Sequence, residues 1–171
     1  MKVAITGHSS GLGKALFELF DNAVGFDLTN GYDIQQPDKI VMESSDCDVF
    51  INNAYYKFCQ VDLLEQLFKE WQYQNKIIVN ISSIAPNVLA PVDTFGLYPT
   101  HKLALDDACY RLQLFKKNCK IINIKPGWID TAMSKDFDVD NKLDPLYLAQ
   151  EIKEVILSKN NFTTITIDRR I

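Results

Sequence analysis

Histidine is scarce in this sequence, and its cysteines are not spaced for metal binding. The chain has 171 residues but only two histidines, His8 and His101, and its four cysteines form no Cys-x-x-Cys pair. Protein zinc sites depend on closely spaced histidine and cysteine ligands, so we expect no bound metal. The sequence also shows no secretory signal, so we expect a cytoplasmic protein whose thiols stay free in a reducing compartment.

Long apolar runs and basic runs are absent as well. No apolar stretch approaches the roughly 20 residues that a helix needs to cross a bilayer, which argues against a membrane protein. The 18 basic and 22 acidic residues leave a net charge of -4, which argues against a nucleic-acid partner and suits a small-molecule one. With 47% hydrophobic residues the chain can bury a core, and its length fits one domain over residues 1–171.

Short apolar runs alternate with amphipathic stretches along the whole chain. This alternation predicts an α/β fold of the doubly wound Rossmann type, with helices on both faces of a mainly parallel sheet of about seven strands. The expected strands are residues 2–6, 23–27, 48–52, 76–81, 120–124 and 163–167, with a short extended piece at 32–34. Helices are expected over 11–20, from Pro37 onward, over 61–74 and 95–117, and from Asp144-Pro145 to about residue 158.

The first expected strand leads into a glycine-rich turn, Thr-Gly-His-Ser-Ser-Gly-Leu-Gly. Glycine at these positions permits a tight turn, close approach of the backbone to a pyrophosphate, and packing of the next helix on the sheet. The N-terminus of that helix then presents free amides and a positive dipole end to the phosphates. We assign the turn residues Gly7, Ser9, Ser10, Gly11, Leu12 and Gly13 to cofactor binding.

Asp27 ends the second expected strand, fourteen residues after Gly13. A carboxylate there can accept hydrogen bonds from the ribose hydroxyls and repel a 2′-phosphate, which favours NAD(H) over NADP(H). Asp27 could also be an ordinary polar strand end. NADP(H) is not excluded, because Lys14 or another cation could accommodate its phosphate.

Tyr98 and Lys102 are four residues apart and so share one face of an expected helix. A phenol titrates near pH ~10, and a neighbouring cation lowers that pKa and makes the group useful in acid-base chemistry. Such a pair alone is more often a packed ring beside a solvated charge, and only the rest of the pattern favours catalysis. Ser82 and Ser83, at the end of the preceding strand, would point to opposite faces.

Taken together, these motifs resemble the short-chain dehydrogenase/reductase family, in its single-domain branch. The resemblance rests on the glycine turn, on the pair Asp33-Ile34, on Asn52-Asn53-Ala54, on Asn80-Ile81-Ser82-Ser83, on Tyr98-x3-Lys102, and on Pro126-Gly127-x3-Thr131. Each motif is short, but their shared order covers nearly the whole chain.

The resemblance implies an NAD-dependent oxidoreductase that transfers a hydride between nicotinamide and a carbonyl or alcohol substrate. Tyr98 would be the acid/base, Lys102 would lower its pKa and hold the nicotinamide ribose, and Ser83 would orient the substrate. The further cofactor-binding residues that it implies are Asp33, Ile34, Asn53, Ala54, Pro126, Gly127, Ile129 and Thr131, and Tyr98 and Lys102 belong to the cofactor-binding set as well. A homo-oligomer, a dimer or tetramer with homodimer as the default, is also expected.

The sequence departs from the family pattern in two places. Tyr55 stands where the family has a glycine, so a ring should lie near the cofactor. Only 24 residues, 55–78, separate Ala54 from Val79, so the segment that carries the family's relay asparagine is missing, and neither Gln74 nor Asn75 can be assigned its role. The region 132–142 is short as well, which predicts an open pocket.

Two other functions fit parts of the pattern. A non-catalytic NAD(H)-binding sensor or partner protein would explain the missing relay asparagine. A sugar-nucleotide epimerase is a weaker alternative, because related epimerases have a different glycine spacing and a C-terminal substrate domain, whereas only 40 residues follow Thr131 here.

Overall fold

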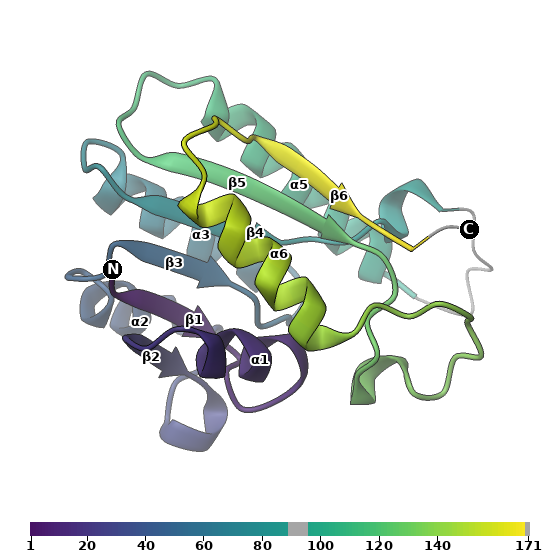
Figure 1. The fold of residues 1–171 in the computed structure, drawn as a ribbon. Coiled ribbons are helices and arrows are strands. Elements are labelled where there is room, and N and C mark those ends of the chain that lie inside the picture. Colours follow the sequence, from purple (N-terminus) through teal and green to yellow (C-terminus); the bar gives the residue numbers. More distant parts are fainter. Residues whose placement is uncertain (89–95, 170–171) are drawn as a thin grey trace.

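A computed structural model describes residues 1–88 and 96–169 and contains one parallel sheet (Figure 1). Its strands are β1 (Val3–Thr6), β2 (Ala23–Phe26), β3 (Val49–Asn52), β4 (Ile77–Ile81), β5 (Lys120–Pro126) and β6 (Thr164–Ile167). They lie side by side in the order β2-β1-β3-β4-β5-β6, and every neighbouring pair is parallel. The predicted fold class is therefore confirmed.

Parallel strands need long crossover connections, and helices provide them. The helices are α1 (Gly11–Leu19), α2 (Pro37–Glu43), α3 (Cys59–Trp71), α5 (Tyr98–Gln113) and α6 (Pro145–Leu157). Helix α5 begins at Tyr98, because Pro99 is tolerated only in a first turn, and it ends at Gln113, before the end of the expected range 95–117; residue 95 lies outside the described residues. None of the helices in the described ranges is both long and apolar enough to cross a membrane.

The described part of the chain has a six-stranded sheet, slightly fewer strands than the approximate number predicted, and the extended piece at residues 32–34 forms no strand. A short 3-10 helix (Leu28–Asn30) precedes this segment, and Gly31 ends it in the left-handed region at φ 85°. Asp33 then accepts a hydrogen bond from the Gln35 amide in a turn that leads directly into α2. The backbone between β2 and α2 therefore forms turns and adds no strand beside β2, which is an edge strand of the sheet.

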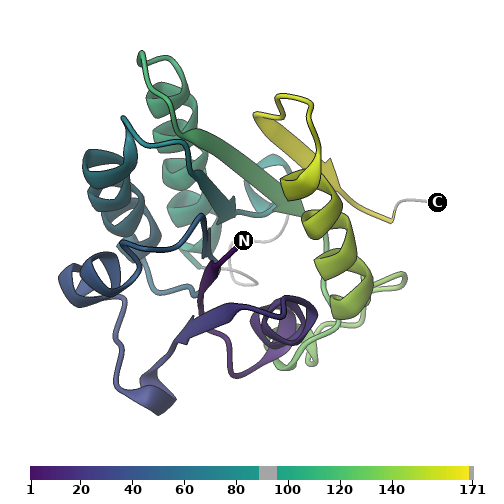
Figure 2. The ribbon, with the colours of Figure 1, turned by 60° about the vertical axis from the view of Figure 1, so that its left-hand side comes forward.

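Two layers of helices cover the sheet, α1 and α6 on one face and α2, α3 and α5 on the other (Figure 2). The buried strands supply both layers because alternate side chains point to opposite faces. Phe50 of β3 packs in the core under α2, α3 and α5, whereas the next residue, Ile51, packs in the core under α1 and α6. This two-sided burial explains the continuous apolar runs in the sequence.

All six strands end at the same edge of the sheet, to the right in Figure 1. The chain leaves β1 toward β2 on one side, and β3 lies on the other side of β1. Loops that follow β1 and β3 therefore diverge at a topological switch point, which is where doubly wound sheets have their binding crevice. Most of the sequence-predicted site residues follow strand ends at this edge.

Candidate active site

The glycine turn after β1 is packed too tightly for other residues. Gly7 adopts φ 70°, in the left-handed region that side chains disfavour. A Cβ on Gly13, in the first turn of α1, would lie 2.0 Å from the carbonyl oxygen of Gly7. The N-cap residue Ser10 does not cap α1 with its own hydroxyl in the described structure. The first amides of this helix can therefore bind an anion.

The end of β3 is fastened to this turn through Thr6. Its hydroxyl oxygen accepts hydrogen bonds from the backbone amides of Asn53 and Ala54, at 2.9 and 3.0 Å. The Asn53 side chain donates in return to the carbonyl of Thr6, at 2.9 Å. The structure thus brings Asn53 and Ala54 against the glycine turn.

Asp27 lies just after β2 and also contacts the turn. The Ser9 hydroxyl donates to its carboxylate at 2.8 Å, and the amide of Thr29 donates at 3.0 Å. Partial burial by itself would raise the pKa of Asp27, but the hydrogen bonds from Thr29 and Ser9 outweigh it and hold the pKa below its ordinary value. Asp27 is therefore an anion at neutral pH, next to the glycine turn.

Asp33 and Ile34 have other contacts. Ile34 is buried in the core that also contains Phe26 and Ile40, so most of its side chain serves packing. Asp33 accepts hydrogen bonds from the backbone and side chain of Gln35. It lies near the start of α3, since its charge adds to the burial that raises the pKa of the Cys59 thiol.

The two serines after β4 have different surroundings. Ser82 is buried, and its hydroxyl donates to Asp106 of α5 at 2.6 Å. Ser83 is partly exposed, accepts a hydrogen bond from the amide of Ala85, and lies close enough to the Tyr98 phenol to lower its pKa. The structure thus brings Ser83 together with Tyr98, and Ser82 serves helix packing.

Tyr98 and Lys102 lie one turn apart on α5, and both are strongly desolvated. The Lys102 ammonium is 5.5 Å from the centre of the Tyr98 ring and donates to Gln60 Oε1 and to the Ile81 carbonyl, each at 2.7 Å. Burial lowers the pKa of Lys102 to about 7, although the charge of Asp106 opposes the change.

Burial also dominates the titration of Tyr98. It raises the pKa of the phenol to about 12; the Ser83 hydrogen bond opposes this change and the nearby Tyr55 adds to it. Lys102 is not among the groups that shift this pKa, and its ammonium is directed toward Gln60 and Ile81. At neutral pH the phenol carries its proton.

The lysine gives the protein a measurable pH dependence. Between pH 7 and 10.5 the unfolded chain keeps a proton on Lys102 that the folded chain has lost, so the free energy of unfolding rises with pH through this window. We expect urea titrations to show this rise in the wild type and to show a smaller one in Lys102→Met. Equal slopes for the two proteins would contradict the burial of a titrating lysine.

Tyr55 covers the tyrosine and lysine, as its position after Asn53-Ala54 suggested. Its ring packs edge-on against Tyr98 with centres 4.8 Å apart, and the Lys102 ammonium lies 5.3 Å from its centre. The Tyr55 hydroxyl is 2.8 Å from Nδ1 of His101, and Phe58 packs edge-on against the same histidine. An aromatic wall therefore encloses one side of the candidate site.

The segment after β5 completes the same edge. The Pro126 carbonyl accepts from the amide of Ile84, which joins it to the serine loop. A Cβ on Gly11 would lie 3.1 Å from Cγ2 of Thr131, so Thr131 lies against the glycine turn. Gly127 is closely approached by Asp168, and Ile129 forms an isolated β-bridge with Leu143.

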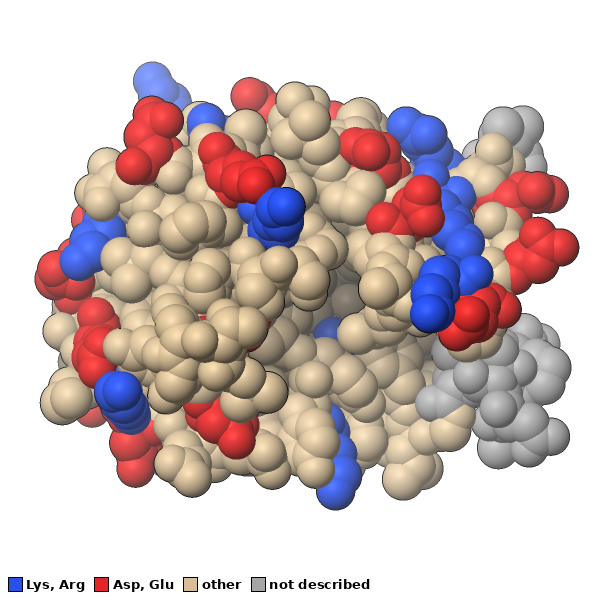
Figure 3. Space-filling view, turned by 90° about the horizontal axis from the view of Figure 1, so that it is seen from below, with Lys and Arg blue, Asp and Glu red and all other residues tan. Residues whose placement is uncertain are grey.

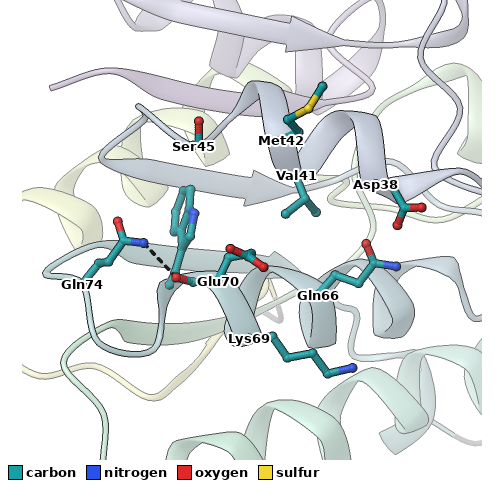
Figure 4. A pocket seen from close by; sticks show the side chains of 9 residues that line it. Asp38, Val41, Met42, Ser45, Gln66, Lys69, Glu70 and Gln74 are labelled. Carbon is teal, nitrogen blue, oxygen red and sulfur yellow. Dashed lines mark hydrogen bonds between the residues drawn. The ribbon is translucent and has the colours of Figure 1, made fainter.

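The surface of the molecule has a hollow, and it also has a groove that lies apart from the candidate site. Seen from below, the molecule is hollowed near its centre, and a basic side chain is visible at the bottom of the hollow (Figure 3). A separate groove of about 540 Å³ lies between α2 and α3, lined by residues such as Val41, Gln66 and Glu70 (Figure 4). None of the predicted site residues lines that groove.

Comparison with known proteins identifies the fold. No family model matches the sequence, and no curated protein matches it. Among solved structures, 4-hydroxyisoleucine dehydrogenase complexed with NADH has a TM-score of 0.80 at 18% identity, over 98% of this chain and 97% of that one. A short-chain dehydrogenase/reductase from Vibrio parahaemolyticus has a TM-score of 0.72 at 19% identity, over 99% and 100%. The chain has the short-chain dehydrogenase/reductase fold.

Another structure with this fold is an alcohol dehydrogenase from the archaeon Thermococcus sibiricus, complexed with 5-hydroxy-NADP. It has a TM-score of 0.76 at 18% identity and covers 98% of this chain and 96% of that one. These matches extend over nearly the whole chain, so the likeness of fold includes all the strands of the sheet.

Within this short-chain dehydrogenase/reductase fold, sequence reasoning missed Gln60. Its side chain contacts Lys102 directly, while Gln74, to which the sequence assigned no role, donates to the Glu70 carbonyl. The sequence does contain a sign that Gln60 is unusual. It lies three residues before the buried Leu63 and four before the buried Leu64, so a polar residue interrupts the apolar face of the helix.

Sequence reasoning also missed a polar cluster around Asp106. The Asp106 carboxylate accepts hydrogen bonds from Ser82, from the Asn123 side chain at 2.7 Å and from the Lys125 ammonium at 2.6 Å. The cluster fixes α5 on β4 and β5. Separately, in residues 1–88 and 96–169 no group of three or more His, Cys, Asp or Glu side chains is arranged to hold a metal ion.

Proposed function

We propose that this protein is an NAD-dependent oxidoreductase of the short-chain dehydrogenase/reductase family, which transfers a hydride between nicotinamide and a carbonyl or alcohol carbon. The observation that carries the proposal is the placement of Ser83, Tyr98 and Lys102 at the strand edge that also holds the glycine turn. The turn follows β1, Ser83 follows β4, and Tyr98 and Lys102 lie on α5. Because all of these lie at one edge of the sheet, a dinucleotide held by the turn can reach the three side chains.

The residues present fit a dinucleotide. Gly13 packs closely on Gly7, so no side chain stands between the turn and the N-terminus of α1. A pyrophosphate at that N-terminus can accept hydrogen bonds from the backbone amides. The Asp27 carboxylate would accept from the hydroxyls of the adenosine ribose. On the nicotinamide side, Lys102, Ile129 and Thr131 would hold the ribose and carboxamide. The nicotinamide, when bound, supplies or accepts the hydride.

Tyr98 would move the proton that accompanies the hydride. In carbonyl reduction the carbonyl carbon gains the hydride, and the oxygen takes a proton from the Tyr98 phenol. The phenol carries its proton at neutral pH, as this direction requires, although its raised pKa makes it a weaker acid than an unperturbed tyrosine. Ser83 would donate a hydrogen bond to the same oxygen and so hold it near the phenol.

Calorimetric titration with NADH and NADPH tests this proposal. We expect NADH to bind more tightly than NADPH, and Asp27→Ala to weaken NADH binding by about 10- to 100-fold, because charge-assisted hydrogen bonds to the ribose are lost. Asp38→Ala, an exposed carboxylate on α2, is the control and should bind NADH like the wild type. A preference for NADPH would contradict the role of Asp27, and no binding of either would remove the proposal.

A further inference from the structure

Gln60 is the second residue of α3 and faces the sheet, with 2% of its surface exposed. A buried amide needs hydrogen-bond partners, and this one has several. Its Nε2 donates to the carbonyl of Asn52 at 2.8 Å and to that of Ile81 at 3.2 Å. Its Oε1 accepts from the Lys102 ammonium at 2.7 Å. One side chain thus connects the ends of β3 and β4 with helix α5.

Gln60 is itself held in place by the sheet. The Asn52 side chain donates to the Gln60 backbone carbonyl at 2.8 Å and to Asn80 Oδ1 at 2.9 Å. Asn52 and Asn80 are register partners on adjacent strands, and both are fully buried. Movement of the Gln60 amide would therefore break hydrogen bonds on both strands.

The Lys102 ammonium has three N–H donors, and two are directed to Gln60 Oε1 and to the Ile81 carbonyl. Ile81 O accepts from both side chains, so lysine and glutamine share one anchor on β4. We propose that Gln60 is a positioning residue that holds the Lys102 ammonium beneath the rings of Tyr98 and Tyr55 and leaves its third N–H for the nicotinamide ribose. This inference rests on the proposed function, because the ribose belongs to that cofactor.

The surroundings of Lys102 explain why an amide suits this position. Tyr98 and Asp106 face it from α5, Tyr55 from the loop after β3, the Ile81 carbonyl from β4 and Gln60 from α3. Asp106 is the charged group among them and is already bonded to Lys125. The neutral oxygen of Gln60 orients the ammonium without holding it permanently charged, as a carboxylate would.

The first test titrates Lys102 in the protein without cofactor, by NMR of ε-13C-labelled lysines, with the signal assigned by its absence in Lys102→Met. Gln60→Glu should raise the pKa of Lys102 by about one pH unit or more, because it adds an opposite charge. Gln60→Leu should lower it, because an acceptor to the ammonium is lost. Gln66→Leu, on the same helix but lining the distant groove, should leave it unchanged.

A raised pKa of Lys102 in Gln60→Glu and a lowered one in Gln60→Leu would support the positioning role. A general loosening of the site would instead shift the pKa of Lys102 in the same direction in both variants. Changes of the same sign, or no change, would overturn it. If Gln60→Leu does not fold, the nearly isosteric Gln60→Glu still decides the question, because an unchanged pKa there contradicts the contact.

The second test uses turnover. Gln60→Leu should lower kcat/KM by about 10- to 100-fold, because the lysine is misplaced, and should shift the pH profile in the same direction as the pKa of Lys102. Profiles of both Gln60 variants that superpose on the wild type would overturn the inference. A wild type without turnover would count against the proposed function instead, while the titration would still test the placement of Lys102.

Discussion

Tyr98→Phe lowers kcat by about 10²- to 10⁴-fold and leaves the Kd for NADH unchanged, if the phenol transfers the proton. Phenylalanine keeps the edge-on packing against Tyr55 and the ring beside the Lys102 ammonium, so the substitution removes only the oxygen that Ser83 contacts. Steady-state oxidation of NADH with a panel of aldehydes and ketones, together with calorimetry, measures both quantities.

The matched control for this variant is Tyr110→Phe. Tyr110 lies on the same helix but is exposed, so its hydroxyl should be dispensable. Turnover by Tyr98→Phe equal to that of Tyr110→Phe would exclude Tyr98 as the acid/base. Loss of NADH binding in Tyr98→Phe would show instead that the ring holds the cofactor pocket in place.

Asp106→Ala lowers the free energy of unfolding by about 3 kcal/mol, because it leaves a buried cation without its carboxylate. Asp106 and Lys125 have side chains only 14% and 13% exposed, at a separation of 2.6 Å. The substitution also removes the acceptor for Ser82 and Asn123. Urea unfolding monitored by circular dichroism measures the loss, and a melting temperature lower by about 6 to 12 °C should accompany it.

The neighbouring residue provides the control for Asp106. Asp107 pairs with Arg111 on the solvent side of α5, where both side chains are well exposed, so Asp107→Ala should leave the melting temperature nearly unchanged. A loss of stability in Asp106→Ala no larger than in Asp107→Ala would show that the buried cluster contributes little.

The strands were predictable because burial on both faces makes them short apolar runs, such as 48–52 and 76–81, and that pattern is local in the sequence. The segment 32–34 has the apolar residues of an extended segment because Tyr32 and Ile34 do pack on the core. The Tyr32 ring lies edge-on against Phe26. The hydrophobicity of these two residues reflects their burial, but the turns at Gly31 and Asp33 determine the backbone conformation of the segment.

The positions of the site residues were predictable to the extent that motifs at strand ends must meet at one edge of a parallel sheet. The contact of Lys102 with Gln60 spans 42 residues and joins two helices, and no local pattern encodes such a contact. The pKa of Tyr98 was equally out of reach, because it depends on how deeply packing by neighbours such as Tyr55 buries the phenol.

Transfer of deuterium from NADH tests the central claim most directly. The wild type, saturated with NADH carrying deuterium at C4 of the nicotinamide, is incubated with the carbonyl panel, and the alcohol products are analysed by mass spectrometry and NMR. Hydride transfer predicts deuterium on the carbinol carbon of at least one product, and its loss in Tyr98→Phe. Bound NADH that transfers deuterium to no carbonyl would contradict the oxidoreductase proposal and favour an NAD(H)-binding sensor.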